Sequence, residues 1–453
     1  MPQTGDPRPP GLAPGFFGGH FFRYRKRPTE YLRELAGLGD VSYMRLFRLP
    51  AYLLNHPDLA RDLLVTSNSK FVKGRALQRA KMLLGEGLLT SEGEAHLRQR
   101  RMIQPAFHKD RIASYAETMS GEAVRIRGEW KTGETLDIDR EMMRLTLRIV
   151  GRTLFGVDVD GDAEDVGAAM TDLIESFDFL LIPFSEYLEK LPIPPANRCR
   201  KAVATLDRVI YGFIKERRMD LSDEGDLLSM LLLARDEDDG DVMTDRQVRD
   251  EAITLFLAGH ETTANALTFT WYLLSQNPEA EKRLHEEIDT VLGGRKPSFE
   301  DLPNLKFTKA VLAESMRLYP PAWAIGRLAA GDHEFGGYNV PKGALVLISP
   351  FVMHRDPRFW DEPDEFRPER WESQSVKEAS RKFIYLPFSR GVRSCIGEGF
   401  AWTEGILAIA AIAQKWRFRL AERQKLGLKP LMTLRPAHGM RMVAERRDAR
   451  TDG

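Results

Sequence analysis

The most informative feature of the chain is the stretch Phe388-Ser-Arg-Gly391-Val-Arg393-Ser-Cys395-Ile-Gly397. It places one of only two cysteines among glycines and arginines, just before a run with a helical pattern. A thiolate is stabilised by backbone N–H groups, and a glycine-rich turn at a helix N-terminus supplies them. The alternative is an ordinary buried thiol, which is the usual state of a free cysteine.

The other residue types of this stretch fit a porphyrin bound to the sulfur. Gly391 allows a tight turn, and Gly397 allows the backbone to approach a flat macrocycle. Arg393 can form charge-assisted hydrogen bonds to a propionate. Phe388 would pack near the proximal face of the ring and help to exclude water. The stretch is therefore typical of a heme-thiolate loop.

The composition is that of a globular protein, since 43% of the residues are hydrophobic and 29% are charged. The 66 lysines and arginines balance the 66 aspartates and glutamates, so no net field attracts nucleic acid or a membrane. Cys199 and Cys395 give no disulfide framework, which favours a reducing cytoplasm. The apolar run at 16–22 is too short to span a bilayer, and the proline-rich start does not resemble a signal peptide. We expect a soluble, cytoplasmic protein without a transmembrane anchor.

Most of the chain has the period of amphipathic helices. The expected helices are 98–128, 140–153, 164–176, 200–219 and 226–234. The expected strands are 41–46, 51–54, 337–348, 417–420 and 440–443. This pattern predicts a mainly α fold with small sheets at one edge. Since there is no internal repeat or linker, we expect one domain at 31–445, after a proline-rich lead at 1–30 and before a tail at 446–453.

A long central helix is expected after the acidic loop at 236–241. Thr244-Asp-Arg-Gln247 resembles a capping box, and Asn277-Pro278 ends the pattern. The centre of this helix, Ala258-Gly259-His-Glu261-Thr262-Thr263, has a glycine where alanine would be better by about 1 kcal/mol. Something is therefore expected to approach this point closely, and a flat cofactor with a diatomic ligand would fit.

The centre of this helix has two other interpretations. Thr262 can simply donate its hydroxyl to a carbonyl of its own helix. His260-Glu261 begins the zinc motif H-E-x-x-H, but Ala264 stands in place of the second histidine, which excludes zinc.

A third feature is the pair Glu314 and Arg317 on an expected helix at 307–318. Most such pairs are surface contacts. Downstream, however, Arg370 follows in Pro368-Glu-Arg-Trp371 and can complete a buried structural cluster with that pair behind the cysteine loop.

In content and order these motifs resemble those of the cytochrome P450 superfamily, across nearly the whole chain. Residues 258–263 are similar to its oxygen-binding helix, and Glu314 and Arg317 to its E-x-x-R pair. Residues 368–371 and 388–397 are similar to its P-E-R-[FW] segment and its F-x-x-G-x-R-x-C-x-G loop. The resemblance implies a single, mostly helical domain that binds heme b, with Cys395 as the axial iron ligand.

The resemblance also implies how the heme is held. His96 and Arg100 match the family's [WH]-x-x-x-R pattern, and Arg327 matches an arginine on the strand after the E-x-x-R helix. With Arg393 they would clamp the propionates, although His96 can also be a solvated helix histidine. His354 is expected to be structural. The remaining heme contacts implied are Ala258, Gly259, Phe388 and Gly397.

The implied activity is that of a monooxygenase, which inserts one oxygen atom of O2 into a C–H or C=C bond of an apolar substrate. Glu261 and Thr262 resemble the acid–alcohol pair that delivers protons to the distal oxygen. A peroxide-driven peroxygenase and a non-enzymatic heme sensor remain alternatives on the same fold. Peroxide-using relatives typically lose the acid–alcohol pair, and a sensor needs no proton relay.

The substrate is not defined by the sequence. The pocket is expected from residues 74–89, 177–195, 254–262, 322–325 and 431–434. Large apolar side chains suggest a large apolar ligand, although such residues are more often plain core: Phe177, Phe179, Leu180, Leu181, Phe184 and Trp323. Fatty acids, terpenoids, steroids and polyketides all remain open.

Electrons are expected from outside the chain, because no flavin or ferredoxin module is recognised in it. We expect an external ferredoxin or flavodoxin with its reductase. Basic residues that can form a docking patch for such an acidic partner are Arg98, Arg100, Arg101, Lys109, Arg111, Lys382 and Arg390.

Overall fold

A computed structural model describes residues 8–156, 163–180, 191, 193–220, 222, 224–234, 240 and 242–447. Helices dominate these residues, which confirms the mainly α class. The chain divides into two compact units: unit 1 contains Met1–Gln78 and Met316–Cys395, and unit 2 contains Arg79–Ser315 and Ile396–Gly453. The single domain expected at 31–445 stays a prediction. No helix in the described ranges has an apolar stretch long enough to cross a bilayer.

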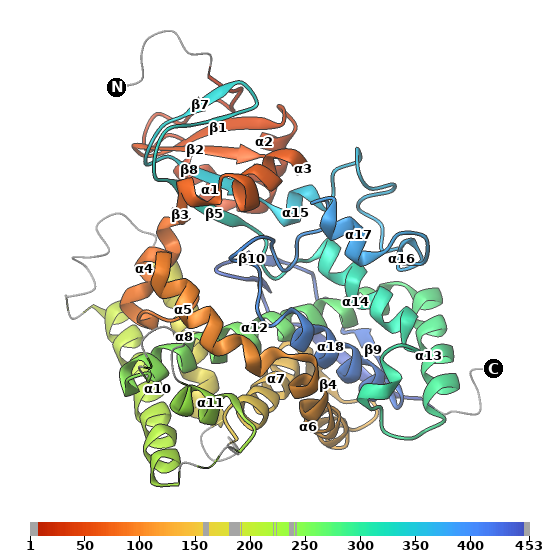
Figure 1. Cartoon of the computed structure of the whole chain (residues 1–453). Helices are drawn as coiled ribbons and strands as arrows, with labels where there is room; N and C mark the ends of the chain where they lie inside the picture. Colours follow the sequence, from red (N-terminus) through yellow and green to blue (C-terminus); the bar gives the residue numbers. More distant parts are fainter. Residues whose placement is uncertain are drawn as a thin grey trace. The chain divides into compact units, whose positions relative to one another are not determined.

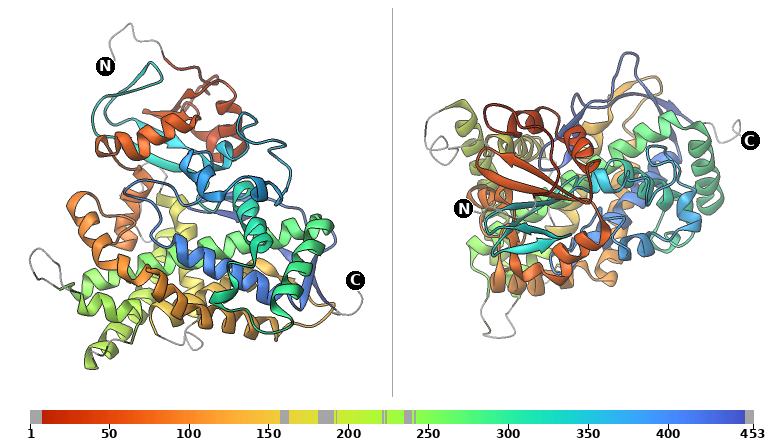
Figure 2. Two further views of the ribbon diagram at one scale, coloured as in Figure 1. Left: turned by 45° about the vertical axis from the view of Figure 1, so that its right-hand side comes forward. Right: turned by 90° about the horizontal axis from the view of Figure 1, so that it is seen from above.

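Unit 1 is built on a five-stranded sheet with the strand order β1-β2-β8-β5-β3. The pair β2 and β8 is parallel and the other pairs are antiparallel. Figures 1 and 2 show β1 and β2, in red, beside the blue-green strands. The elements are α1 (Phe21–Lys26), α2 (Pro28–Ala36), β1 (Val41–Leu46), β2 (Leu49–Leu54), α3 (Pro57–Arg61), β3 (Phe71–Lys73), β5 (Ile325–Ala329), β6 (His333–Phe335), β7 (Tyr338–Val340), β8 (Leu345–Ile348), α15 (Pro350–Met353), α16 (Arg370–Ser373) and α17 (Val376–Arg381).

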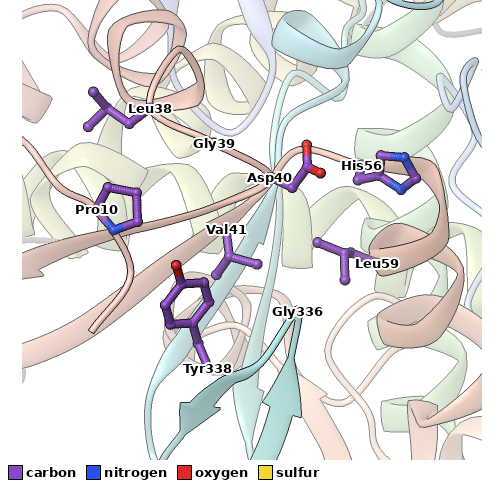
Figure 3. Close-up of a pocket in the computed structure, with 9 residues that line it drawn as sticks. All are labelled: Pro10, Leu38, Gly39, Asp40, Val41, His56, Leu59, Gly336 and Tyr338. Atoms are coloured by element: carbon purple, nitrogen blue, oxygen red, sulfur yellow. The ribbon is translucent and has the colours of Figure 1, made fainter. Parts of the chain in front are cut away.

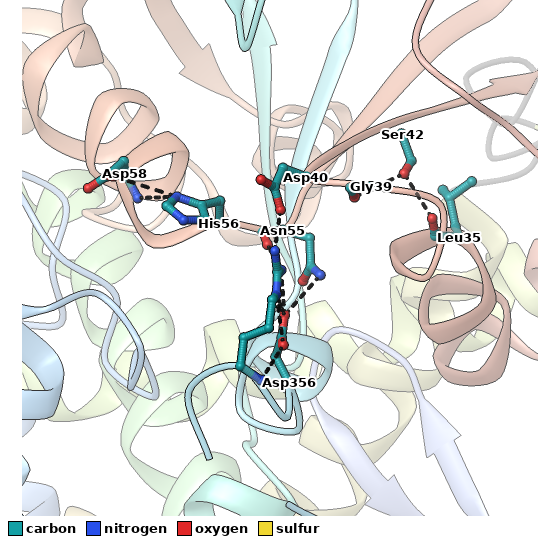
Figure 4. A network of polar contacts seen from close by, with 9 residues as sticks. Leu35, Gly39, Asp40, Ser42, Asn55, His56, Asp58 and Asp356 are labelled. Atoms are coloured by element: carbon teal, nitrogen blue, oxygen red, sulfur yellow. Dashed lines mark hydrogen bonds and ion pairs between the residues drawn. The ribbon is translucent and has the colours of Figure 1, made fainter. Parts of the chain in front are cut away.

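A polar network ties this sheet to the turn after α15 (Figure 4). The guanidinium of Arg358 bonds both carboxylate oxygens of Asp356 and reaches Asp40 at 2.6 Å and the carbonyl of Asn55 at 2.8 Å. The side-chain amide of Asn55 donates to Oδ2 of Asp356 at 3.3 Å. Because Arg358 satisfies four acceptors at once, this network is a structural clamp rather than a site.

Unit 2 is mostly helical, and α12 packs along α7 while α18 packs on α6 and α10 on α8. Phe155, after α7, stacks on Phe256 of α12 with ring centres 4.1 Å apart. The elements are α5 (Gly93–Ile103), α6 (Lys109–Arg127), β4 (Thr135–Asp137), α7 (Ile138–Leu154), α8 (Ala163–Leu180), α10 (Pro194–Met219), α11 (Leu227–Leu233), α12 (Asp245–Gln276), α13 (Pro278–Leu292), α18 (Glu398–Ala413), β9 (Trp416–Leu420), β10 (Leu428–Pro430), β11 (Leu434–Pro436) and β12 (Arg441–Arg446). The chain passes between the units at three points: within α4 (Arg75–Leu84), within α14 (Lys306–Leu318), and between Cys395 and Ile396.

The long central helix is confirmed as α12. Its capping box is present, because Thr244 Oγ1 accepts from the amide of Gln247 at 3.3 Å and Gln247 Oε1 accepts from the amide of Thr244 at 2.9 Å. The helix ends at Gln276, before Pro278. The expected helices at 140–153, 200–219, 226–234 and 307–318 correspond to α7, α10, α11 and α14.

Two expected elements are wrong in extent. The helix expected at 98–128 is split into α5 and α6 by a 3-10 turn at Gln104–Phe107, because Pro105 has no amide hydrogen and disfavours a helical residue before it. The strand expected at 337–348 is split into β7 and β8 by a turn that contains Pro341 and Gly343, with φ of 83° at Gly343. The acidic loop at 236–241 lies outside the described residues except for Gly240, and so does the tail beyond Arg447.

Candidate active site

The cysteine loop of unit 1 is closed by its own backbone. The amide of Cys395 donates to the carbonyl of Phe388 at 2.9 Å, and the amide of Ser394 donates to Gly391 at 3.0 Å. Gly391 has φ of 80°, and a Cβ there would meet the carbonyl oxygen of Leu64 at 2.1 Å. Only glycine fits this position, as the sequence predicted. The loop presents the side chain of Cys395 exposed, whereas Cys199 is buried in α10.

A buried histidine fixes the start of this loop. Nε2 of His354 accepts from the amide of Leu386 at 2.7 Å, and its Nδ1 lies 3.2 Å from the carbonyl of Arg317. Burial, helped by the nearby charge of Arg317, lowers the pKa of His354 to about 3. The ring is therefore neutral, with its proton assigned to Nδ1 so that both contacts are hydrogen bonds. The expected structural role of His354 is confirmed.

Two cations of unit 1 lie on the neighbouring strands β3 and β5, and a third, Arg393 of the cysteine loop, contacts the backbone of β3. Arg327 of β5 lies directly opposite Lys73 of β3, and both side chains are buried. Nη1 of Arg393 donates to the carbonyl of Phe71, also on β3, at 3.1 Å. Directly opposite residues of an antiparallel pair share a face, and two cations there repel each other unless an anion is close. This donor set suits a carboxylate, and Lys73 was not predicted from the sequence.

The arginines of the E-x-x-R pair and of the segment 368–371 both contact one indole ring. The guanidinium of Arg317 lies 5.3 Å from the ring centre of Trp360, and that of Arg370 lies 5.9 Å from it. Arg317 also donates to the carbonyls of His354, Pro363 and Glu365 at 2.6–2.9 Å. Glu314 is fully buried on α14, one turn before Arg317. These contacts fit the structural role expected of the two arginines.

In unit 2, the helix α12 has one accessible strip at its centre. From Val248 to Trp271 every residue is buried except Ala258, Gly259 and Thr262. These are residues that the sequence placed against a cofactor. The close neighbour of Gly259 is Val150 of α7, whose Cγ2 would lie 3.1 Å from an added Cβ. Packing against α7 therefore explains part of the need for glycine there.

The hydroxyl of Thr262 donates to the carbonyl of Ala258 at 2.7 Å. This is the bond within the helix that the sequence left as an alternative. The hydroxyl is nevertheless on the accessible strip, so rotation about χ1 can direct it elsewhere. The neighbouring Glu261 is fully buried.

Glu261 is held by a hairpin formed by β10 and β11. Its Oε1 accepts from the hydroxyl of Thr433 at 2.5 Å and lies 3.5 Å from Nε of Arg435. Asn265, one turn along α12, donates to Thr433 at 3.3 Å. Burial raises the pKa of Glu261, while the charge of Arg435 and the bond from Thr433 oppose that rise.

Arg435 also affects two other titratable groups. Burial raises the pKa of Asp139 on α7 to about 6, and Arg435 opposes that shift. Burial and then the charge of Arg435 lower the pKa of His260 to about 3. The ring of His260 bonds Thr146 at 2.9 Å, which links α12 to α7. The residue next to Thr262 on α12, Glu261, is thus a buried acid with a charged partner, Arg435. Sequence reasoning missed Arg435, and it included Thr433 only within an expected pocket segment at 431–434, not as a partner of Glu261.

The segment after α4 is fixed by the start of α12. The amide of Glu86 donates to Asp250, and that of Leu88 donates to Glu251, both at 2.9 Å. The carbonyl of Leu88 in turn lies 3.2 Å from Nδ1 of His96, which is buried. Arg100 lies one turn further along α5 and is half-buried. His96 is therefore not the solvated histidine of the alternative.

The other predicted pocket and docking residues are only partly described. The side chains of Phe177, Phe179 and Leu180, and the whole of Leu181 and Phe184, lie outside the described residues. Trp323 is buried in unit 1. In the predicted docking patch, Arg111 donates to the carbonyl of Gly225 at 3.2 Å.

A separate cavity of about 260 Å³ lies at the edge of unit 1 (Figure 3). It contains none of the predicted site residues. Its lining residues are Pro10, Leu38, Gly39, Asp40, Val41, His56, Leu59, Gly336 and Tyr338. Because Asp40 is already bonded to Arg358, the cavity offers no free set of polar groups that converge on a ligand.

The family model described as Cytochrome P450 matches residues 7–440 of the chain. The chain belongs to the cytochrome P450 family. P450 proteins of this family bind heme b through a cysteine thiolate, and the residues of this P450 fit that group. One exposed cysteine, buried cations around β3 and an accessible strip on an otherwise buried helix are the features that a heme requires.

Three relatives of this P450 are Streptomyces proteins, and two of them are named as oxygenases. Cyclooctatin synthase of Streptomyces melanosporofaciens is 41% identical over 440 residues, which are 96% of this chain and 95% of the relative. Cyclooctat-9-en-7-ol 5-monooxygenase of the same organism is 41% identical over 90% of this chain and 89% of its own. Pentalenene oxygenase of Streptomyces avermitilis is 36% identical over 90% of this chain and 91% of its own length. This P450 is accordingly a monooxygenase that acts on an apolar substrate.

Proposed function

We propose that this P450 inserts one oxygen atom of O2 into a C–H or C=C bond of a cyclic terpene hydrocarbon or of its alcohol. Two relatives are named for an unsaturated hydrocarbon, pentalenene, and an unsaturated alcohol, cyclooctat-9-en-7-ol. The observation that carries the reaction is the accessible strip of Ala258, Gly259 and Thr262, which has a hydroxyl as its only side-chain hydrogen-bonding group. Such a surface suits an apolar substrate beside a reacting oxygen.

We assign the heme contacts as follows. Cys395 supplies the thiolate ligand, since its loop exposes the thiol and closes the backbone behind it. Arg327, Arg393 and Lys73 hold a propionate at β3, and His96 with Arg100 supply further donors from α5. Bound heme supplies the oxygen-activating redox chemistry. The other residues that would contact the heme are Phe388, Gly397, Ala258 and Gly259.

The protein's own part in the reaction is proton delivery and exclusion of water. Glu261 is buried and keeps its proton to a higher pH than an exposed carboxyl, so it is a suitable proton store. Thr262 passes protons onward once its hydroxyl turns away from the carbonyl of Ala258. Thr433 and Arg435 hold the acid in place between turnovers.

Electrons come from a separate ferredoxin or flavodoxin in this proposal. Arg101 and Lys109 are exposed at the end of α5 and the start of α6, where an acidic partner can reach them. Complementary charge of this kind speeds association more than it strengthens binding.

The test is turnover under 18O2 with a general bacterial ferredoxin and its reductase, using pentalenene-like cyclic hydrocarbons and their alcohols. We expect a product that carries one 18O atom and is formed only with reduced cofactor. Substrate oxidation that needs peroxide but no reductase, or no substrate binding by any cyclic terpene, would refute the proposal.

A further inference from the structure

Five phenylalanines gather at the turn between β1 and β2 in unit 1. Phe17 stacks on Phe22 with ring centres 6.0 Å apart, and Phe47 of the turn lies 4.7 Å from Phe21 and 5.9 Å from Phe22. Phe16, which precedes them, is fully exposed, and Phe17 and Phe22 are 71% and 54% exposed. Proteins rarely leave adjoining large rings in water unless the surface binds something.

The backbone beneath these rings is fixed. The buried ring of His20 bonds the carbonyl of Leu12 through Nε2 at 2.8 Å and accepts from the amide of Arg45 through Nδ1 at 2.8 Å. Gly19 has φ of 65°, and a Cβ there would meet the carbonyl oxygen of Arg45 at 2.5 Å. The exposed rings are therefore held in place by the sheet rather than on a loose end.

Positive charge surrounds the same rings. On α1, Arg25 and Lys26 follow Phe21 and Phe22 at the i,i+4 spacing that puts residues on one face of a helix. Arg45 and Arg48 flank Phe47 in the sequence. Neither segment, 16–27 or 45–48, contains an aspartate or glutamate.

Only part of this charge is neutralised. Arg23, on the other side of α1, pairs with Glu34. Among the described residues, no carboxylate forms an ion pair with Lys26, Arg27, Arg45 or Arg48, and all four are exposed. The whole chain has no net charge, so this is a local excess of positive charge around an apolar centre.

We propose that this aromatic-basic patch, formed by Phe16, Phe17, Phe22, Lys26, Arg45 and Arg48, docks unit 1 on the surface of an anionic phospholipid bilayer. Aromatic rings are favoured at the boundary between headgroups and acyl chains, and basic residues are attracted by anionic headgroups. Each basic residue at such a surface strengthens binding about fivefold. An acidic protein partner would match the charge but not the exposed rings at the centre.

The test uses the full-length, heme-loaded enzyme and sedimentation with lipid vesicles. One set of vesicles contains equal parts of phosphatidylglycerol and phosphatidylcholine, and the other contains phosphatidylcholine alone. We expect binding to the anionic vesicles only, weakened by salt. The double variant Lys26→Gln/Arg48→Gln should bind about 25-fold more weakly, and Phe16→Ser/Phe17→Ser at least about tenfold more weakly.

Matched controls change other exposed residues. Lys131→Gln/Lys282→Gln removes the same charge from unit 2, and Met219→Ser removes a 76% exposed apolar side chain from α10. Both should bind like the unaltered enzyme, and all variants should keep the same heme spectrum. Equal binding to neutral vesicles, or equal losses in the controls, would overturn the proposal. The proposal would also be overturned if the enzyme bound no vesicles and instead formed a dimer in sedimentation velocity that was lost in the phenylalanine variant.

Discussion

Nε of Arg435 lies 3.5 Å from Oε1 of Glu261, so the acid at the centre of α12 has a cation as its partner. The two residues are far apart in the chain, and Arg435 is on β11 beside Thr433, which donates to the same oxygen. Charge on Glu261 is thus stabilised by the hairpin and opposed by burial. The balance between these effects sets the pH range in which Glu261 holds a proton.

Replacing Arg435 should change that balance. Arg435→Gln removes the charge that opposes the rise in the pKa of Glu261, so the acid stays protonated to higher pH. The alkaline limit of coupled turnover, measured as product per reduced cofactor consumed, should move to higher pH. Arg435→Lys keeps the charge, so its alkaline limit should lie close to that of the unaltered enzyme. The control is Lys429→Gln, directly opposite on β10, whose ammonium pairs with Glu175 instead. An unchanged pH profile in Arg435→Gln would exclude Glu261 as the proton store.

Thr262→Ala should uncouple oxygen reduction from product formation. We expect product per reduced cofactor to fall at least about tenfold, with the difference released as hydrogen peroxide, because a positioned proton donor contributes that much or more. Thr268→Ala is the matched control, since Thr268 makes the same bond to the carbonyl four residues earlier but is fully buried. Equal uncoupling in both variants would point to helix geometry rather than proton transfer.

Gly391→Ala should abolish heme binding, because the added Cβ would lie 2.1 Å from the carbonyl oxygen of Leu64. The control is Gly343→Ala, because Gly343 has a similar positive φ, 83° against 80°, but an added Cβ there would meet nothing within 4 Å. This variant should lose about 1–2 kcal/mol of stability and still bind heme. Heme content per polypeptide measures both, and retention of heme in Gly391→Ala would contradict the assigned loop.

Glu404 should make stability depend on pH. It is fully buried on α18, and burial raises its pKa well above the ordinary value of 4.5. Above pH 4.5 the unfolded chain loses this proton while the folded protein keeps it, so the folded state becomes less favoured as pH rises. In Glu404→Gln this loss is absent. The variant should therefore gain stability relative to the unaltered protein as the pH rises. The difference between their free energies of unfolding should grow by about 1.4 kcal/mol for each pH unit above 4.5. A constant difference across that range would show that Glu404 is ionised in the folded protein.

The sequence was most informative where one residue type was required locally. Gly391 and the capping box of Thr244 and Gln247 were predicted because their geometry depends on neighbours in the chain. The break at Pro105 was missed, because the apolar period continues through it. The strands β10 and β11 are only three residues long and each contains a proline, so they carry no strand signal.

The missed hairpin explains the missed partners of Glu261. Nothing near Thr433 or Arg435 in the sequence indicates that they contact a helix more than 150 residues earlier. Lys73 was missed for a similar reason, because its pairing with Arg327 depends on the register between β3 and β5. Motifs identify the cofactor, whereas the residues that tune it come from long-range contacts.

The central claim is that Cys395 supplies a thiolate to heme iron, and the absorption spectrum of the dithionite-reduced, carbon monoxide-bound protein tests it most directly. Cys199→Ser is the control, since that cysteine is buried in α10. A strongly red-shifted Soret band in the unaltered protein and in Cys199→Ser, lost in Cys395→Ser, is the predicted result. An ordinary imidazole-like band in the unaltered protein, or a red-shifted band that survives in Cys395→Ser, would contradict the account.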